Sequence, residues 1–442
     1  MSCLEIRISF ETIRSELFVH ADDPANGIRA SVPLWEGDGE GTDGELKKRL
    51  DDIQAGYDLL KTAPLSDLKL WGTTLFKTAF RGDTLSLFDS LTPSVGPDRP
   101  LRIRFVHNHL SENFFWLSQL PWELIFWQRG QIFLVQDRRF SIVRTLQVPW
   151  NRAMTSTQQA QCLFALASPT GSGALQVDRE SLSLPKVSNA SRLQKVTVRS
   201  ATRKRLRTAL LDETVHVFHF GGHGYRERNG SELSFGVILE DAFGDPDRMG
   251  SDELGRWIAD AGVQLVVLNG CWTGAKSRRN SSSFHGVAQR LIRAGIPAVL
   301  AMAHPVKDSS AIELAQTFYE RLARTDSIES ALTEARRHIH ELHSNFHEWL
   351  TPVLFLQSPQ SELLARPSNS PTNRQSEADS RSEVEVRVKD SKLERSKIVG
   401  EDSELPSHAD ANQPNVRVHV EAVEGRGIEI VGKRTRPFQP KS

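Results

Sequence analysis

Two short glycine-flanked segments carry the side chains best suited to chemistry. His223 follows Gly221 and Gly222 at the end of the run HVFHF, and Cys271 follows Gly270 at the end of QLVVLN. Glycines leave such a side chain on a sharp turn with little crowding. A thiolate is a nucleophile, and a nearby imidazole can accept its proton and later protonate a leaving amine. The pair therefore predicts nucleophilic catalysis by Cys271 with His223 as general base.

The order and spacing of the two residues support this interpretation. They lie 48 positions apart with the histidine first (271 − 223 = 48), which is close to the roughly 50 residues typical of caspases. Such chemistry also needs an oxyanion hole. We predict that the backbone N–H groups of Gly224 and Cys271 supply it, because both lie on glycine-flanked turns.

The neighbouring residues allow other interpretations. His216 and His219 lie in the apolar run before the turn and are predicted to be hydrogen-bonded core or sheet residues. A zinc site made of His219, His223 and Cys271 is an alternative, but the sequence lacks CxxC and HExxH spacing, so we predict no metal and no cofactor. The basic segment 275–283 is interpreted as a solvated loop, a border of the substrate cleft or a self-cleavage site.

Three other residues bear on catalysis or specificity. Cys162 begins an apolar run, so its replacement is predicted to be neutral for catalysis. Asp241 and Asp308 are candidates for lining a pocket for Lys or Arg, or else are ordinary loop or helix-cap carboxylates.

The elements around the two turns predict an α/β fold, with a mostly parallel six-stranded sheet flanked by helices, which the family resemblance given below identifies as caspase-like. Runs that are apolar at consecutive positions are typical of strands covered on both faces. The predicted strands are 162–168, 195–199, 214–220, 264–269, 297–303 and 352–357. The predicted helices are 201–211, 252–261, 284–294 and two between 309 and 342. Sites in such sheets form outside the carboxyl ends of strands, and a right-handed crossover lets neighbouring ends meet.

The chain is predicted to have three parts. Residues 1–150 form an α/β region without a chemical motif, with strand-like runs at 4–10, 101–107 and 131–135 and a helical stretch at 71–88. Residues 160–358 form the catalytic domain. Residues 359–442 form a polar tail, predicted to be largely disordered or to bind a partner, with alternating patches at 384–388 and 416–430. No internal repeat is predicted, and therefore no solenoid.

Composition narrows the possible partners and compartment. Fifty-five basic residues balance 55 acidic ones and are scattered, which argues against nucleic-acid binding. Three widely spaced cysteines do not make a disulfide framework and fit a reducing compartment. The sequence shows neither a signal peptide nor an apolar run of about 18 residues. We therefore expect a cytoplasmic protein that does not enter a membrane.

Four segments together resemble the CHAT peptidase domains, which are relatives of caspases, separase and gingipains. They are HFGGHG, LVVLNGCWTG, GVAQRLIRAGIPAVLAMAHPV and TPVLFL, and the likeness covers roughly residues 71–357. The resemblance implies endopeptidase activity, with His223 as the catalytic histidine, Cys271 as the nucleophile and Gly224 in the oxyanion hole. The segment NGCWTG differs from the QAC form of caspases, so cleavage after aspartate is not predicted.

Family members often act in prokaryotic defence or regulated cell death by cutting a particular protein. The expected function is therefore limited cleavage of a partner protein. One alternative is a scaffold of the same fold in which His223 and Cys271 are catalytically latent or inactive. Another is a signalling adaptor whose tail binds a regulatory or sensor protein.

Overall fold

The computed structural model divides the chain into two compact units, Met1–Pro367 and Ser368–Ser442, which are described separately. It describes residues 3–13, 16–34, 48, 50–53, 62–107, 117–149, 152–171, 192–229, 232–270, 283–304, 306–324, 327–343, 347–365, 384–389, 397–399, 416–421 and 429–431. Across these ranges no helix is long and apolar enough to cross a membrane.

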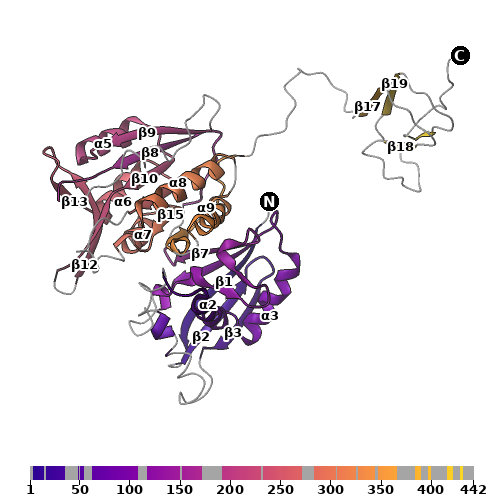
Figure 1. Ribbon diagram of the computed structural model, residues 1–442, viewed down its shortest axis with the longest axis horizontal. Coiled ribbons are helices and arrows are strands. Elements are labelled where there is room, and N and C mark those ends of the chain that lie inside the picture. The colour runs from indigo at the N-terminus through magenta and orange to yellow at the C-terminus, as the bar shows by residue number, and fades with distance from the viewer. Residues whose placement is uncertain are drawn as a thin grey trace. The chain divides into compact units, whose positions relative to one another are not determined.

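An eleven-stranded sheet runs through the first unit in the order β3-β2-β1-β4-β7-β16-β15-β14-β10-β8-β9 (Figure 1). The N-terminal region contributes β1 (Leu4–Ile13), β2 (Glu16–Asp23), β3 (Ile28–Pro33), β4 (Leu101–His107) and β7 (Phe140–Leu146). The remaining strands are β8 (Ala160–Leu166), β9 (Leu193–Arg199), β10 (Val217–Gly221), β14 (Leu265–Asn269), β15 (Ala298–Met302) and β16 (Pro352–Leu356). The six predicted strands are thus six of eleven, and residues 1–150 extend the same sheet.

Most strand pairs are parallel, but the sheet reverses direction between β15 and β16 near its middle, and again at the pairs β1–β2 and β2–β3 at one edge. Strands β9, β8, β10, β14 and β15 run one way. Strand β16 is antiparallel to β15 and parallel to β7. Strand β7 is parallel to β4, and β4 is parallel to β1. The carboxyl ends of β10 and β14 therefore lie at the same edge of the sheet, as predicted.

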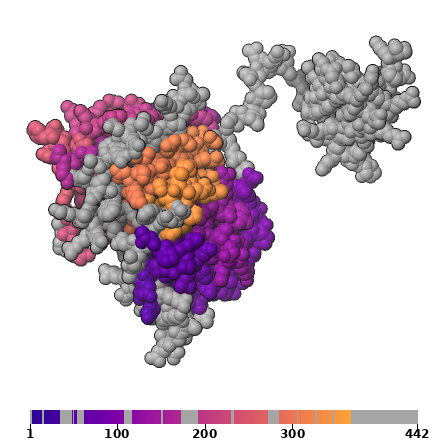
Figure 2. Space-filling view, in the orientation of Figure 1, coloured from indigo at the N-terminus to yellow at the C-terminus, as the bar shows by residue number. Residues whose placement is uncertain are grey.

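Helices cover the half of the sheet formed by β8–β10 and β14–β16 on both faces. They are α5 (Arg203–Asp212), α6 (Ser251–Asp260), α7 (Ser283–Arg293), α8 (Asp308–Ala323) and α9 (Ile328–Leu342). In β14, Leu265 and Val267 pack into the core of α8 and α9, whereas Val266 and Leu268 pack into the core of α5, α6 and α7. Both faces are apolar because both are buried. Figure 2 shows the orange surface of α8 and α9 next to the violet N-terminal region.

The N-terminal region also contains helices and short elements. Helices α2 (Leu65–Ala79) and α3 (Gly82–Leu91) replace the single predicted stretch at 71–88, and Gly82 at the break has a φ of +48°. The predicted strand at 131–135 is shorter than expected, because β6 (Ile132–Phe133) gives way to a 3₁₀ turn, Leu134–Gln136. The other short elements are β5 (Phe126–Trp127) and the 3₁₀ turns Thr92–Ser94, Trp122–Leu124 and Glu348–Leu350.

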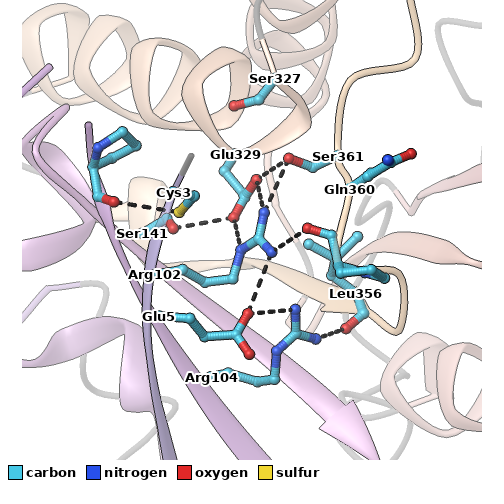
Figure 3. Close-up of polar contacts among 12 residues, drawn as sticks. Cys3, Glu5, Arg102, Arg104, Ser141, Ser327, Glu329, Leu356, Gln360 and Ser361 are labelled. Carbon is cyan, nitrogen blue, oxygen red and sulfur yellow. Dashed lines mark hydrogen bonds and ion pairs between the residues drawn. The ribbon is translucent and has the colours of Figure 1, made fainter. Parts of the chain in front are cut away.

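Two buried arginines of β4 join the N-terminal strands to α9 and to the segment after β16 (Figure 3). Arg102 donates from Nε and Nη2 to the two carboxylate oxygens of Glu329 at 2.5 and 2.9 Å, and from Nη1 to the carbonyl of Pro359 at 2.7 Å. Arg104 donates to Glu5 at 3.0 Å and to the carbonyl of Leu356. Burial alone would raise the pKa of Glu329, but the Arg102 guanidinium lowers it below its usual range.

Residues 358–365, here called the strap, continue from this cluster across the unit. The hydroxyl of Ser358 accepts from the backbone N–H of Met154 at 3.0 Å. Thr157 exchanges backbone hydrogen bonds with Leu363 and Ala365 at 2.9 Å. Leu363 and Leu364 are buried in the core. The strap therefore belongs to the folded first unit.

We predict that the cut point of a C-terminal truncation decides stability. A chain ending at Gln357 should lose at least about 3 kcal/mol of unfolding free energy, because the buried Arg102 loses the Pro359 carbonyl and the buried Arg104 loses the Ser358 carbonyl as acceptors. A chain ending at Pro367 should melt at the temperature of the full chain. Thermal unfolding of both would test this, and equal melting temperatures for the two truncations would refute it.

The second unit contains two small parallel sheets. Strand β17 (Val384–Lys389) pairs with β19 (Val416–Glu421), and β18 (Lys397–Val399) pairs with β20 (Glu429–Val431). The alternating patches predicted at 384–388 and 416–430 coincide with three of these strands, β17, β19 and β20.

Candidate active site

The two turns of the predicted dyad follow neighbouring strands. Gly221, the last residue of β10, pairs with Asn269, the last residue of β14. The backbone N–H of Gly222 then donates to the carbonyl of Asn269 at 3.4 Å. Gly221 and Asn269 are 48 positions apart, the same separation as His223 and Cys271. The strand register therefore brings the turn of His223 beside the segment that leads to Cys271.

His223 is half-buried where the main sheet meets a smaller one. It is the first residue of β11 (His223–Asn229) and pairs with Ile238 of β12 (Glu232–Glu240), which pairs in turn with β13 (Pro246–Gly250). Gly224 is the second residue of β11 and lies opposite Val237. Backbone pairing on both sides thus fixes the position of His223.

Cys271 lies outside the described residues, as do positions 272–282, so the basic segment predicted at 275–283 is described only from Ser283, the first residue of α7. The structure describes both flanks of this stretch. Gly270 is buried on one side, and α7 begins on the other. The described residues nearest to Cys271 are therefore Gly270, directly after β14, and Ser283, the first residue of α7.

Gly270 is required by close packing against α7. A Cβ at this position would lie 2.0 Å from Cε2 of Phe284, which is itself buried. The adjacent Asn269 is fully buried and donates from Nδ2 to the carbonyl of Ala311 in α8 at 3.4 Å. The residue before Cys271 is therefore held between two helices.

Gly222 has a similar requirement on the histidine side. A Cβ there would lie 2.6 Å from Cζ of Phe220 and 3.3 Å from the carbonyl oxygen of Ala167. The rings of Phe220 and Phe284 lie edge to face with centroids 6.3 Å apart. The two glycine turns are thus packed around one pair of aromatic side chains.

We predict that Gly270→Ala will displace the turn before Cys271. The variant should lose about 1–3 kcal/mol of stability from overpacking and react more slowly with a thiol-directed peptide electrophile. The double variant Gly270→Ala with Phe284→Ala should recover part of the reactivity, because the clash is removed. Additive effects of the two substitutions on reactivity would contradict this packing explanation.

The predictions for the neighbouring histidines are confirmed. His219 is fully buried, its Nδ1 lies 2.9 Å from the Tyr319 hydroxyl, and its ring stacks on Phe164 at 4.3 Å. The Nδ1 of His216 accepts from the backbone N–H of Gln161 at 3.1 Å. Among the described residues no group of three His, Cys, Asp or Glu could hold a metal ion.

The other two cysteines are poor nucleophiles. Burial raises the pKa of the Cys162 thiol to about 12. Burial is also the main reason why the pKa of Cys3 is raised to about 11, and its thiol donates to the carbonyls of Leu4 and Pro100 at 3.1 and 3.3 Å. Because the thiolate is the attacking species, both sites are unfavourable for catalysis.

The two acidic candidates for a specificity pocket differ. The Oδ1 of Asp241 accepts from the backbone N–H groups of Phe243 and Asp245 at 2.8 Å, which makes Asp241 an ordinary loop carboxylate. Asp308 is the first residue of α8, and Lys307 is the N-cap of this helix. The backbone N–H of Lys307 donates to the carboxylate of Glu348 at 3.0 Å, and not to Asp308. Within the described ranges the buried Oδ1 of Asp308 has no hydrogen-bond partner, so Asp308 is the better candidate.

His285 is a residue that the sequence did not single out. It lies in the first turn of α7, buried, with its ring edge to face on Phe355 at 5.2 Å and its Nε2 3.3 Å from Nε2 of Gln289. Burial, and then the nearby Arg144 guanidinium, lower its pKa to about 3. A neutral His285 therefore anchors the helix that follows Cys271. This role becomes evident only from the packing of α7 against β16, which buries His285.

We predict that His285 makes the fold sensitive to acid. Its pKa is lower in the folded state than in the unfolded state, so the unfolded chain binds the proton first, and stability falls as pH drops from about 6.5 towards about 3, by up to about 1.4 kcal/mol per pH unit. His285→Gln should flatten the slope of unfolding free energy against pH in this range. An unchanged slope in His285→Gln would refute the assignment.

One family model and several solved structures are similar to this chain. The model of the CHAT domain family matches residues 95–371, more than half of the chain. No curated protein sequence matches. The structure is similar to separase in the separase–securin complex of Saccharomyces cerevisiae, with a TM-score of 0.40, 10% identity and coverage of 79% of this chain. This chain spans 30% of that separase chain.

A second similar structure is the complex of the pro- and mature domains of RgpB from Porphyromonas gingivalis. Its TM-score is 0.37 and its identity 12%, over 78% of this chain and 82% of that chain. The family match includes His223, Gly224 and Cys271, and with them both glycine turns at the sheet edge. The chain belongs to the CHAT domain family.

Proposed function

We propose that this protein is a cysteine endopeptidase in which His223 activates Cys271. The observation that carries the proposal is the in-register pairing of β10 with β14, since both residues follow the paired strand ends at the same distance. Membership in the CHAT domain family supports the same chemistry. The raised thiol pKa values of Cys3 and Cys162 leave Cys271 as the candidate nucleophile among the three cysteines.

The proposed reaction has two chemical steps. His223 accepts the thiol proton, the Cys271 thiolate attacks the peptide carbonyl, and the backbone N–H groups of Gly224 and Cys271 stabilise the oxyanion. His223 then donates its proton to the leaving amine, which leaves a thioester on Cys271. Water attacks the thioester with His223 as general base and releases the carboxylic acid.

The proposed biological role is limited cleavage of a partner protein in prokaryotic defence or regulated cell death. This role rests on the resemblance to CHAT peptidases, whose members often cut one particular protein. Asp308 is the proposed contact for a basic substrate side chain, because its buried Oδ1 has no partner in the described part of the chain. A regulatory or sensor protein would act through residues 368–442, which form a separate unit.

Covalent labelling with a thiol-directed peptidyl electrophile tests the dyad. We expect an adduct on Cys271 that disappears in Cys271→Ala and forms at least about 100-fold more slowly in His223→Ala, the scale of lost acid–base catalysis. Intact mass and digestion would locate and time the adduct. Cys162→Ala should label at the wild-type rate.

His216→Ala is the matched control for the histidine, because His216 precedes the opposite end of the same strand, β10. It should not change the labelling rate of Cys271. Labelling that is equally fast in wild type, His216→Ala and His223→Ala would favour the alternative of a caspase-like scaffold with an inactive pair. Loss of partner binding on truncation after Pro367, without such labelling, would favour an adaptor.

A further inference from the structure

The second unit contains a repeated segment. Residues 384–400 read VEVRVKDSKLERSKIVG, and residues 416–432 read VRVHVEAVEGRGIEIVG. The two copies share valines in alternation at the start and the sequence IVG at the end. The expectation that the chain has no internal repeat is therefore wrong for this region. The repeat was not recognised from the sequence because it is short and its middle residues differ between the two copies.

The structure pairs the two copies with each other in one register. Val384 of β17 pairs with Val416 of β19, and Lys397 of β18 pairs with Glu429 of β20. Both pairs are 32 positions apart, the same shift that aligns the repeat in the sequence. Equivalent residues therefore lie side by side in parallel strands, as in consecutive rungs of a β-solenoid.

The register pairs identical apolar residues at five positions and opposite charges at three, and it pairs Arg387 with His419. The identical apolar pairs are Val384–Val416, Val386–Val418, Val388–Val420, Ile398–Ile430 and Val399–Val431. The opposite-charge pairs are Glu385–Arg417, Lys389–Glu421 and Lys397–Glu429. Opposite charges on neighbouring strands stabilise their pairing, and like charges oppose it.

Two strands are too few to make a stable sheet in water. Among the described residues of this unit each sheet has two strands, so within these ranges its outer edges carry backbone groups able to pair with further strands. A second copy placed on the β19 edge would put its Glu385, Lys389 and Lys397 beside the oppositely charged second repeat. Identical apolar residues would also continue in register, as in cross-β stacks.

We propose that strands β17–β20 of separate copies of this chain stack in parallel and in register, each copy adding two rungs. The occupant of the open edge is thus a second copy of the same chain. The charge complementarity between the two repeats specifies this occupant. The second repeat of one copy carries charges opposite to the first repeat of the next copy, as it does to the first repeat of the same copy.

Charge variants of the full chain test the proposal. The first-repeat variant carries Glu385→Arg, Lys389→Glu and Lys397→Glu, so both repeats have the same charge pattern. We expect the wild type to sediment as assemblies that grow with concentration and the first-repeat variant to stay monomeric. A wild type that is monomeric throughout, or a first-repeat variant that assembles as the wild type does, would overturn the proposal.

An exchanged variant separates register from net charge. It carries the first-repeat changes together with Arg417→Glu, Glu421→Lys and Glu429→Lys, so the two charge patterns trade places. It should assemble with itself as the wild type does, because every rung again meets an opposite pattern. It should not form mixed assemblies with the wild type, because like charges would meet wherever a wild-type copy stacks on an exchanged copy. Mixing would be measured as energy transfer between labelled wild-type and labelled exchanged chains, and we expect none. Equal mixing would overturn the proposed register.

Fibre diffraction of the assemblies gives an independent readout. Two rungs per chain predict a strand spacing of about 4.8 Å and an axial rise of about 9.6 Å per copy. The chain ending at Pro367 is the control and should stay monomeric at every concentration. Assembly of that truncated chain to the wild-type extent would place the interface in the first unit and overturn the proposal.

Discussion

The hydrogen-bonded register between β10 and β14 is the constraint on which the candidate site depends. In a parallel strand pair, residues far apart in the chain lie side by side. Gly221 pairs with Asn269, which is 48 positions later, and Cys271 is likewise 48 positions after His223. A slip of one residue would turn the side chains of a strand to its other face. Both faces here are buried in different cores, so that slip is strongly disfavoured.

The rest of the first unit supports this register from two sides. On one side, Phe284 and His285 fix the start of α7, and Asn269 is bonded to α8. On the other side, the ion pair of Arg102 with Glu329 joins the N-terminal strands to α9. Both ions are buried, so removing Glu329 would leave Arg102 with only the more distant carboxylate of Glu5, at 3.4 Å, as an ion-pair partner among the described residues. The N-terminal region is thus part of the same framework as the site.

Much of this arrangement could be predicted from the sequence. The six C-terminal strands and five helices were visible because their apolar runs and their glycine ends are strong local signals, and His219 was correctly assigned to the core. The eleven-stranded sheet could not be predicted, because the β7–β16 pairing joins residues far apart in the chain. His285 looks like an ordinary polar helix residue until Phe355 is placed against it. The repeat was missed because only its valines and its IVG ends are shared.

The point at which the chain leaves the first unit has a further consequence. Ala365 is bonded to Thr157 and Arg192, which precede the first residues of β8 and β9, whereas His223 and Gly270 follow the last residues of β10 and β14. The covalent tether to residues 368–442 therefore starts at the sheet edge opposite the candidate site. A fusion joined directly after Ala365 would therefore begin at the edge where β8 and β9 start, and not at the edge where β10 and β14 end.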